Sequence, residues 1–121
     1  MAPAKILIVQ DDFLAAERLR LLLKKAGHVV VGVASGTDDA DRLAEEHHPD
    51  LAIIDMMLEV DVDGVHTATT LAREHDVKIL ITTGFPDSVV QAERVHEIAC
   101  AILKKPYSDQ DVLDAVARCL A

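Results

Sequence analysis

The sequence predicts an α/β domain built on an open parallel sheet of five strands, with helices on both faces. Short apolar runs recur along the chain and alternate with longer segments in which apolar residues follow helical spacing. The runs do not alternate apolar with polar residues, which is typical of parallel strands buried on both sides. A length of 121 residues suits one domain, residues 1–121.

The first half of the chain holds three of the predicted strands and two of the predicted helices. The strands are expected at residues 5–9, 28–33 and 51–55. A helix is expected at residues 13–26, because its apolar residues share one face and Gly27 supplies a C-terminal stop. The second helix is expected to start with Thr37 or Asp38 as its N-cap and to end before Pro49.

The second half continues the same alternation. The remaining strands are expected at residues 77–82 and 100–104. A helix before the first of them is predicted by the helical spacing of Val65, Ala68 and Ala72. A short, weakly amphipathic helix is expected at residues 87–97. Ser108 and Asp111 form a capping box that starts the last helix. The apolar face of this helix consists of Val112, Leu113, Val116, Ala117 and Leu120.

Composition and charge narrow the class of function. The net charge is −9, from 12 basic and 21 acidic residues, which disfavours DNA, RNA or an anionic membrane as a partner because these bind through clustered cations. No apolar stretch approaches the roughly 20 residues of a membrane span, and the N-terminus lacks a targeting signal, so a cytoplasmic protein is expected. Cys100 and Cys119 have apolar neighbours and are expected to be packed thiols, not a disulfide.

Polar side chains stand where the predicted strands end. Two acids follow the first strand, an acid ends the third, a hydroxyl follows the fourth and an ammonium follows the fifth: Asp11, Asp12, Asp55, Thr83 and Lys105. In an open parallel sheet, ligands bind outside the carboxyl ends of the strands. Acid, hydroxyl and ammonium groups gathered at that edge suit a phosphate group and a divalent metal ion.

These residues lie in motifs that resemble those of the receiver domains of two-component response regulators. The matching pieces are Ile8-Val9-Gln10-Asp11-Asp12, Ile53-Ile54-Asp55, Asp63-Gly64, Thr82-Thr83-Gly84 and Lys104-Lys105-Pro106. Their order and spacing carry the resemblance, which extends over essentially the whole chain. It implies a flavodoxin-like (βα)5 doubly wound fold with strand order 2-1-3-4-5.

The resemblance assigns a role to Asp55. In this family the matching aspartate is the nucleophile that accepts a phosphoryl group and forms an acyl phosphate, and Asp55 is expected to do the same. Lys105 is expected to bind a phosphoryl oxygen, and Thr83 to donate its hydroxyl once the phosphoryl group has arrived. Thr82 is expected to point to the other face of the sheet, because side chains alternate along a strand.

The resemblance also implies a bound Mg²⁺ ion, with Mn²⁺ as an alternative, and no other cofactor. The expected ligands are Asp11, Asp55 and the backbone carbonyl of Met57. Asp12 is a candidate indirect ligand, although on its own it is better explained as the N-cap of the first helix. Gln10 stands where the family usually carries a second acid, so a weaker metal site is expected.

Two further departures from the family pattern bear on signalling. Ile102 occupies the position at which many receivers carry a switching Tyr or Phe, so a switch of that type is not expected. Met57 and Phe85 are apolar, and in the family their positions flank the water that attacks the acyl phosphate. Because apolar side chains cannot orient that water, slow autodephosphorylation is expected. Phe85 either moves with its loop to carry the signal or fills the edge of the core.

The resemblance implies a bacterial phosphorelay protein. A histidine kinase or histidine phosphotransfer protein is the expected phosphodonor. A downstream protein is expected to bind the surface of the fourth helix, fifth strand and fifth helix, with no nucleic acid or membrane as partner. The chain is expected to be a stand-alone receiver or, alternatively, a piece of a larger regulator. It is not expected to be a conventional enzyme, because it would catalyse only its own phosphorylation and slow dephosphorylation.

Three other functions stand as alternatives. A degenerate receiver that binds its partner independently of phosphorylation is favoured by Gln10. A small phosphatase with an aspartate nucleophile would need a second acid two residues after Asp55, where Met57 stands. A flavin-binding protein is disfavoured, because no loop rich in Ser, Thr and Gly follows the first strand.

Overall fold

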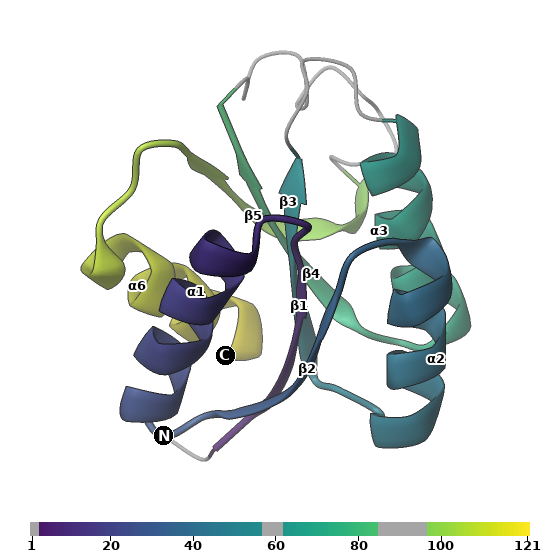
Figure 1. Ribbon diagram of the computed structural model, residues 1–121, viewed down its shortest axis with the longest axis horizontal. Coiled ribbons are helices and arrows are strands. Elements are labelled where there is room, and N and C mark those ends of the chain that lie inside the picture. Colours follow the sequence, from purple (N-terminus) through teal and green to yellow (C-terminus); the bar gives the residue numbers. More distant parts are fainter. Residues whose placement is uncertain (1–2, 57–61, 85–96) are drawn as a thin grey trace.

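The computed structural model describes residues 3–56, 62–84 and 97–121, which form a sheet between two layers of helices (Figure 1). The strands are β1 (Lys5–Val9), β2 (Val29–Ala34), β3 (Leu51–Met56), β4 (Lys78–Thr83) and β5 (Ala99–Lys104). The helices of the described residues are α1 (Phe13–Lys25), α2 (Thr37–His47), α3 (Val62–Glu74) and α6 (Asp109–Leu120). All strand pairs are parallel and their order is β2-β1-β3-β4-β5, which confirms the predicted fold class and strand order.

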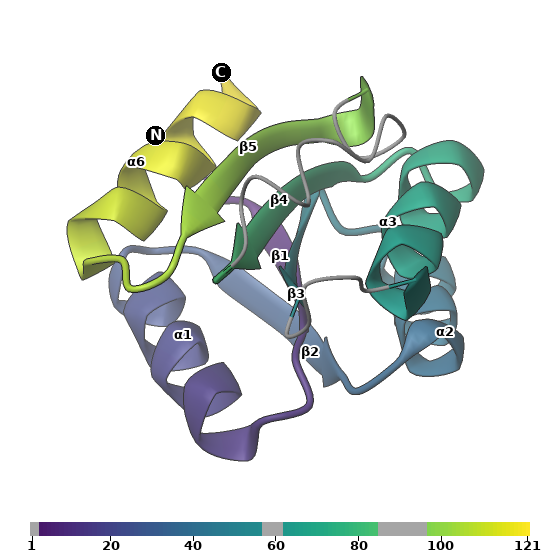
Figure 2. The same cartoon turned by 90° about the horizontal axis from the view of Figure 1, so that it is seen from above.

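The sheet separates two aliphatic cores. Figure 2 shows α1 and α6 on one side of the sheet and α2 and α3 on the other. Successive residues of β3 alternate between the two cores: Leu51 and Ile53 pack with α1 and α6, whereas Ala52 and Ile54 pack with α2 and α3. Each fully buried Ile or Leu stabilises the fold by about 1.5–3 kcal/mol. The third side chain on the α1 and α6 side of β3 is Asp55, so the acid emerges directly from this core.

The strand boundaries agree with the sequence to within one residue, and α1 ends one residue earlier than expected. Gly27 ends the first helix region with a φ of 94°, a left-handed conformation that favours glycine. Ser108 and Asp111 form the predicted capping box, in which each side chain accepts a hydrogen bond from the backbone N–H of the other residue. The short helix predicted at residues 87–97 falls almost wholly outside the described residues.

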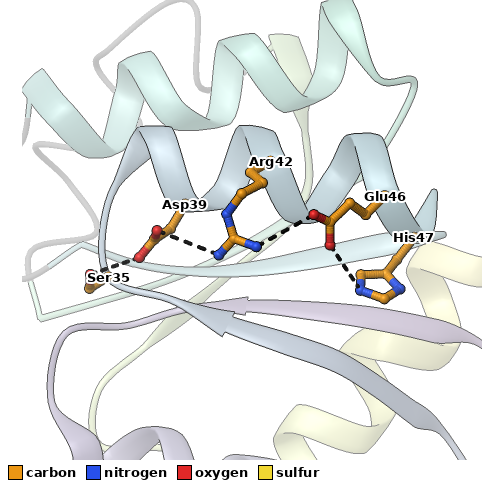
Figure 3. A network of polar contacts seen from close by, with 5 residues as sticks. All are labelled: Ser35, Asp39, Arg42, Glu46 and His47. Carbon is orange, nitrogen blue, oxygen red and sulfur yellow. Dashed lines mark hydrogen bonds and ion pairs between the residues drawn. The ribbon is translucent and has the colours of Figure 1, made fainter.

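The predicted cap of the second helix is wrong. The N-cap of α2 is Gly36, which offers no side chain, and Thr37 is the first helical residue. The Thr37 hydroxyl instead lies 2.5 Å from that of Thr67 on α3. The exposed side of α2 carries a chain of polar contacts, shown in Figure 3, that links Ser35, Asp39, Arg42, Glu46 and His47. Such exposed pairs contribute only a few tenths of a kcal/mol each.

The prediction that Cys100 and Cys119 are packed thiols is also wrong, because they form a disulfide between β5 and α6. The register of β4 and β5 shifts here: Ile79 pairs with Ala99 and Leu80 pairs with Ala101, which leaves Cys100 as the extra residue of a bulge. The bulge interrupts the alternation of side chains, and the two Cα atoms lie 5.4 Å apart, within bonding range. The apolar residues beside each cysteine in the sequence do not indicate that the two cysteines lie next to each other in the fold.

Among the described residues, no helix has both the length and the apolar character needed to cross a bilayer.

Candidate functional site

Asp55 lies at the carboxyl edge of the sheet, between two neighbouring strands. The arrowhead of β3 in Figure 1 points toward this edge. In register, Ile54 pairs with Val9 of β1, so the chain leaves β1 beside Asp55. On the other side Asp55 pairs with Thr82 of β4. Parallel pairing therefore brings the residues after β1 and the end of β4 to the same carboxylate.

The two oxygens of the Asp55 carboxylate have different surroundings. The side chain is only 4% exposed. Its Oδ1 atom forms an ion pair with the Lys105 ammonium and accepts a hydrogen bond of 2.9 Å from the Thr82 hydroxyl. Its Oδ2 atom is buried and has no hydrogen-bond partner among the described residues. Because burying an anionic oxygen without a partner is costly, Oδ2 is the atom at which this site is incomplete.

The structure brings Thr82, not Thr83, to Asp55. Thr82 was expected to point to the opposite face, and this expectation is wrong: Thr82 lies on the same face as Asp55 and donates to it. Thr83 is fully buried and pairs in register with Met56. The predicted strand at residues 77–82 becomes Lys78–Thr83, and within it the residue beside Asp55 is one position earlier than expected. The sequence motif alone, with two adjacent threonines, could not decide between them.

Lys105 reaches Asp55 from the end of β5, as predicted. Its backbone N–H donates to the Thr83 carbonyl at 2.8 Å, which fixes the start of the loop between β5 and α6. The peptide bond between Lys105 and Pro106 is cis. The Lys105 ammonium forms an ion pair with Oδ1 of Asp55, and about one-third of the lysine side chain stays exposed to solvent. The lysine is thereby held from both its backbone and its head group.

Tyr107 also belongs to this site, and sequence reasoning missed it. Partial burial raises the pKa of its hydroxyl, and the negative charge of Asp55 raises it further, whereas the charge of Arg18 and a hydrogen bond with Thr82 act in the opposite direction. Tyr107 therefore lies close enough to Thr82 and Asp55 to feel both side chains. It lies in a loop and not at a strand end. The available signal was its position two residues after Lys105, as the only tyrosine in the sequence.

The turn between β1 and α1 assigns different tasks to three polar residues. Asp12 is the N-cap of α1, and its Oδ1 atom accepts hydrogen bonds from the backbone N–H groups of Leu14 and Ala15. The side-chain oxygen of Gln10 accepts a hydrogen bond of 3.0 Å from the backbone N–H of Asp12. Asp11 is exposed, and its carboxylate is not bonded to any described residue. Asp11 is thus the acid of this turn that is left for a ligand.

The donor set fits a divalent cation. Hard cations such as Mg²⁺ take carboxylate oxygens and retain several waters. The described part of the site offers two oxygen donors: the exposed carboxylate of Asp11, in the turn that follows β1, and the Oδ2 atom of Asp55 on the neighbouring strand β3, which has no partner among the described residues. A cation there would satisfy the buried oxygen. Met57 and Phe85, which the sequence placed in this site, lie outside the described residues.

The sequence matches a family model described as the response regulator receiver domain over residues 6–117. The transcriptional regulatory protein PdtaR of Mycobacterium tuberculosis is 33% identical over 115 residues, which cover 94% of this chain and 55% of PdtaR. The polar-differentiation response regulator DivK of Brucella ovis is 30% identical over 107 residues, 85% of each chain. The chain thus spans about half the length of PdtaR and most of DivK.

The fold is also similar to a solved structure, the signal receiver domain of a modulated diguanylate cyclase from Desulfovibrio desulfuricans G20. The TM-score is 0.84 and the identity 31%, with 98% of this chain and 94% of that chain covered. Sequence and fold therefore agree over nearly the whole chain.

Proposed function

Because the chain belongs to the response regulator receiver domain family, we propose that it accepts a phosphoryl group on Asp55 and thereby changes its affinity for a protein partner. The phosphodonor is a histidine kinase or a histidine phosphotransfer protein. The observation that supports this most directly is the buried Oδ2 atom of Asp55, which has no hydrogen-bond partner in the part of the chain that the structure describes. No described donor competes for the lone pair that would attack phosphorus.

The side chains around Asp55 suit this transfer. Lys105 and Thr82 hold Oδ1 and so orient the carboxylate, which leaves Oδ2 as the nucleophile. A bond forms between Oδ2 and phosphorus while the bond between phosphorus and the donor nitrogen breaks, and the donor histidine takes up a proton. The Lys105 ammonium can then shift from the Asp55 carboxylate to a phosphoryl oxygen, because it binds either negatively charged oxygen.

Asp11, Asp55 and the backbone carbonyl of Met57 are the proposed ligands of a Mg²⁺ ion, which Mn²⁺ can replace. When bound, the ion supplies positive charge to the transferring phosphoryl oxygens. Asp12 is proposed to reach the ion only through water, since its Oδ1 atom already caps α1 and only Oδ2 is left. The amide of Gln10 is neutral and bonded to the backbone, so metal affinity is weak.

The signal is proposed to pass through Thr83 and Lys105 to the surface that includes β5 and α6. The net charge of −9 favours a protein over nucleic acid as the partner. The proposed location is the cytoplasm of a bacterium. Slow autodephosphorylation is proposed from the apolar residues Met57 and Phe85.

The test is modification of Asp55 by a small phosphodonor. The wild type, Asp55→Ala and the surface control Asp114→Ala are incubated with Mg²⁺ and acetyl phosphate and measured by intact mass. Wild type and Asp114→Ala are expected to gain the mass of one phosphoryl group, and Asp55→Ala none. Equal gain in all three variants would place the phosphate elsewhere and contradict the proposal.

A degenerate receiver is the second candidate, and Gln10 favours it. Its side chain supports the turn before α1 where an acid would serve the metal. Such a protein would bind its partner without phosphorylation. No mass gain in the wild type, together with no binding of beryllofluoride in the presence of Mg²⁺, would support this candidate over phosphoryl acceptance.

A further inference from the structure

The disulfide between Cys100 and Cys119 closes a covalent ring around part of the functional site. Cys100 lies near the start of β5 and Cys119 near the end of α6, so the ring includes most of both elements and the loop that joins them. Lys105 and Tyr107 lie in that loop. Lys105 forms an ion pair with Asp55, and Tyr107 interacts electrostatically with the same carboxylate. We propose that this disulfide is a reversible redox switch that controls how freely α6 and its loop move against the sheet.

The two sulfur atoms differ in access. Cys100 is an exposed residue of β5, whereas Cys119 is only 4% exposed and packs with Ala115 and Val116 in the core beneath α6. Thiol–disulfide exchange needs an attacking thiolate to reach one sulfur in line with the other. A dithiol reductant therefore attacks Cys100.

The exchange is balanced in atoms and electrons. The reductant thiolate forms a bond with the Cys100 sulfur, the bond between the two cysteines breaks, and Cys119 leaves as a thiolate that takes up a proton. The second thiol of the reductant then displaces Cys100 and closes its own disulfide. The protein has gained two electrons and two protons, and the dithiol has been oxidised.

The fold accommodates the reduced state as well as the oxidised one. A Cys119 thiol would remain in an apolar core, where a free cysteine behaves as a small hydrophobic residue. The sulfur of Cys100 lies 3.0 Å from the carbonyl oxygen of Ile79. A disulfide sulfur has no proton to donate, but a Cys100 thiol would donate to this oxygen. Neither sulfur would be left without a suitable environment, so opening the ring need not unfold the domain.

The proposed cytoplasmic location favours switching over a purely structural role. Cellular thiols keep cytosolic cysteines reduced, and the disulfides that do form there are usually transient and catalytic or redox-sensing. The aliphatic cores on both faces of the sheet bury apolar side chains from every described strand and helix, so the crosslink is not the main source of packing. The preference for a switch and its consequence for signalling rest on the proposed function, whereas the thiol–disulfide chemistry itself does not.

The first experiment measures the redox equilibrium. The protein is equilibrated in buffers of reduced and oxidised dithiothreitol, thiols are trapped with a maleimide, and mass and circular dichroism are recorded. The switch requires complete interconversion in both directions with an unchanged spectrum, and faster labelling of Cys100 than of Cys119. A disulfide that opens only in denaturant, or a reduced form that loses its spectrum, would overturn the proposal.

The second experiment measures motion. Amide hydrogen exchange in α6 is compared between oxidised protein, reduced protein and Cys100→Ala/Cys119→Ala, with α2 as the internal reference. Exchange in α6 is expected to be roughly tenfold faster in the reduced protein and in the double variant, with α2 unchanged. Equal rates in α6 would show that the crosslink restrains nothing and would overturn the proposal.

The third measurement separates the two proposals. Asp55→Ala cannot accept a phosphoryl group but keeps both cysteines, so its redox equilibrium should match that of the wild type. A wild type that interconverts but takes up no phosphate would remove the proposed function and leave the switch standing. Uptake of phosphate by a protein whose disulfide cannot be reduced in the folded state would do the opposite.

Discussion

At the scale of single residues, the Asp55 carboxylate is divided between support and reactivity. Lys105 and Thr82 both bind Oδ1 and neither binds Oδ2. Removal of either side chain should therefore change the orientation of Oδ2 indirectly, through the carboxylate. The sequence identified Asp55 and Lys105 because each ends an apolar run. It did not identify Thr82 correctly, because adjacent threonines differ only in which face of β4 they occupy, and that depends on the register with β3.

Thr82→Val is expected to lower the free energy of unfolding at neutral pH by about 1.5–3 kcal/mol, the usual contribution of a hydrogen bond to a charged group. The cost arises from the lost bond to Asp55, so it should shrink strongly when the same change is made in Asp55→Ala. Urea denaturation of the four proteins measures this coupling. Thr83→Val serves as the control, since its cost should be the same in both backgrounds.

Tyr107→Phe is expected to change how stability depends on alkaline pH. The pKa of Tyr107 is raised by folding, mainly through burial, so the folded protein retains the hydroxyl proton more tightly than the unfolded chain. Its contribution is present below about pH 10, the usual tyrosine value, and is lost as the pH rises through the higher folded value. Denaturation at pH 8 to 11 should show a shallower decline for Tyr107→Phe. Parallel declines would contradict this prediction.

At the scale of secondary-structure elements, the sequence predicted which helices and strands exist, and their order, better than it predicted where each one begins and ends. Apolar runs and helical spacing depend on neighbours in the chain, and they placed the five strands and α1 to within one residue. The prediction of the α2 N-cap was wrong because the four consecutive residues 35–38 are all of types that commonly cap helices. In the structure Gly36 is the cap, and the Thr37 hydroxyl lies beside that of Thr67 on α3, a tertiary contact that the local sequence does not reveal.

Ser108→Ala is expected to destabilise the domain by about 1 kcal/mol, because it removes the side chain that caps α6. Ser35→Ala is the matched control. Ser35 donates to Asp39 but does not cap α2, so its loss should cost no more than about 0.5 kcal/mol. Chemical denaturation of both variants measures the two losses in the free energy of unfolding. Equal losses would show that the Ser108 cap contributes no more than an ordinary surface hydrogen bond.

At the scale of the whole molecule, the two edges of the sheet differ in how they are held. At the amino edge, His28 accepts a hydrogen bond from the backbone N–H of Ala4, and Asp50 accepts one from that of Lys5. At the carboxyl edge, the carboxylate of Asp11 and the Oδ2 atom of Asp55 have no such partners among residues 3–56, 62–84 and 97–121. The local sequence pattern could predict the edge at which the site lies, because the carboxyl ends of parallel strands lie at the same edge of a sheet. It could not predict the disulfide, which depends on a bulge in β5 and the position of α6.

Reduction is expected to lower the free energy of unfolding by about 3 kcal/mol, the loop-entropy value for a crosslink that joins residues 19 apart. The effect acts on the unfolded chain, which gains conformations when the ring opens. Urea denaturation with and without a phosphine reductant measures it. Cys100→Ala/Cys119→Ala should be indifferent to the reductant, and an equal response in both proteins would assign the change to the reagent.

The covalent ring has a practical consequence for anyone who digests this protein. A protease that cuts after Lys104 severs the backbone between Cys100 and Cys119, yet the two pieces stay joined through sulfur. The nicked chain should run as a single band in a denaturing gel without reductant and as two bands once reductant is added. A fragment pattern collected only under reducing conditions would therefore report a broken molecule where a connected one had existed.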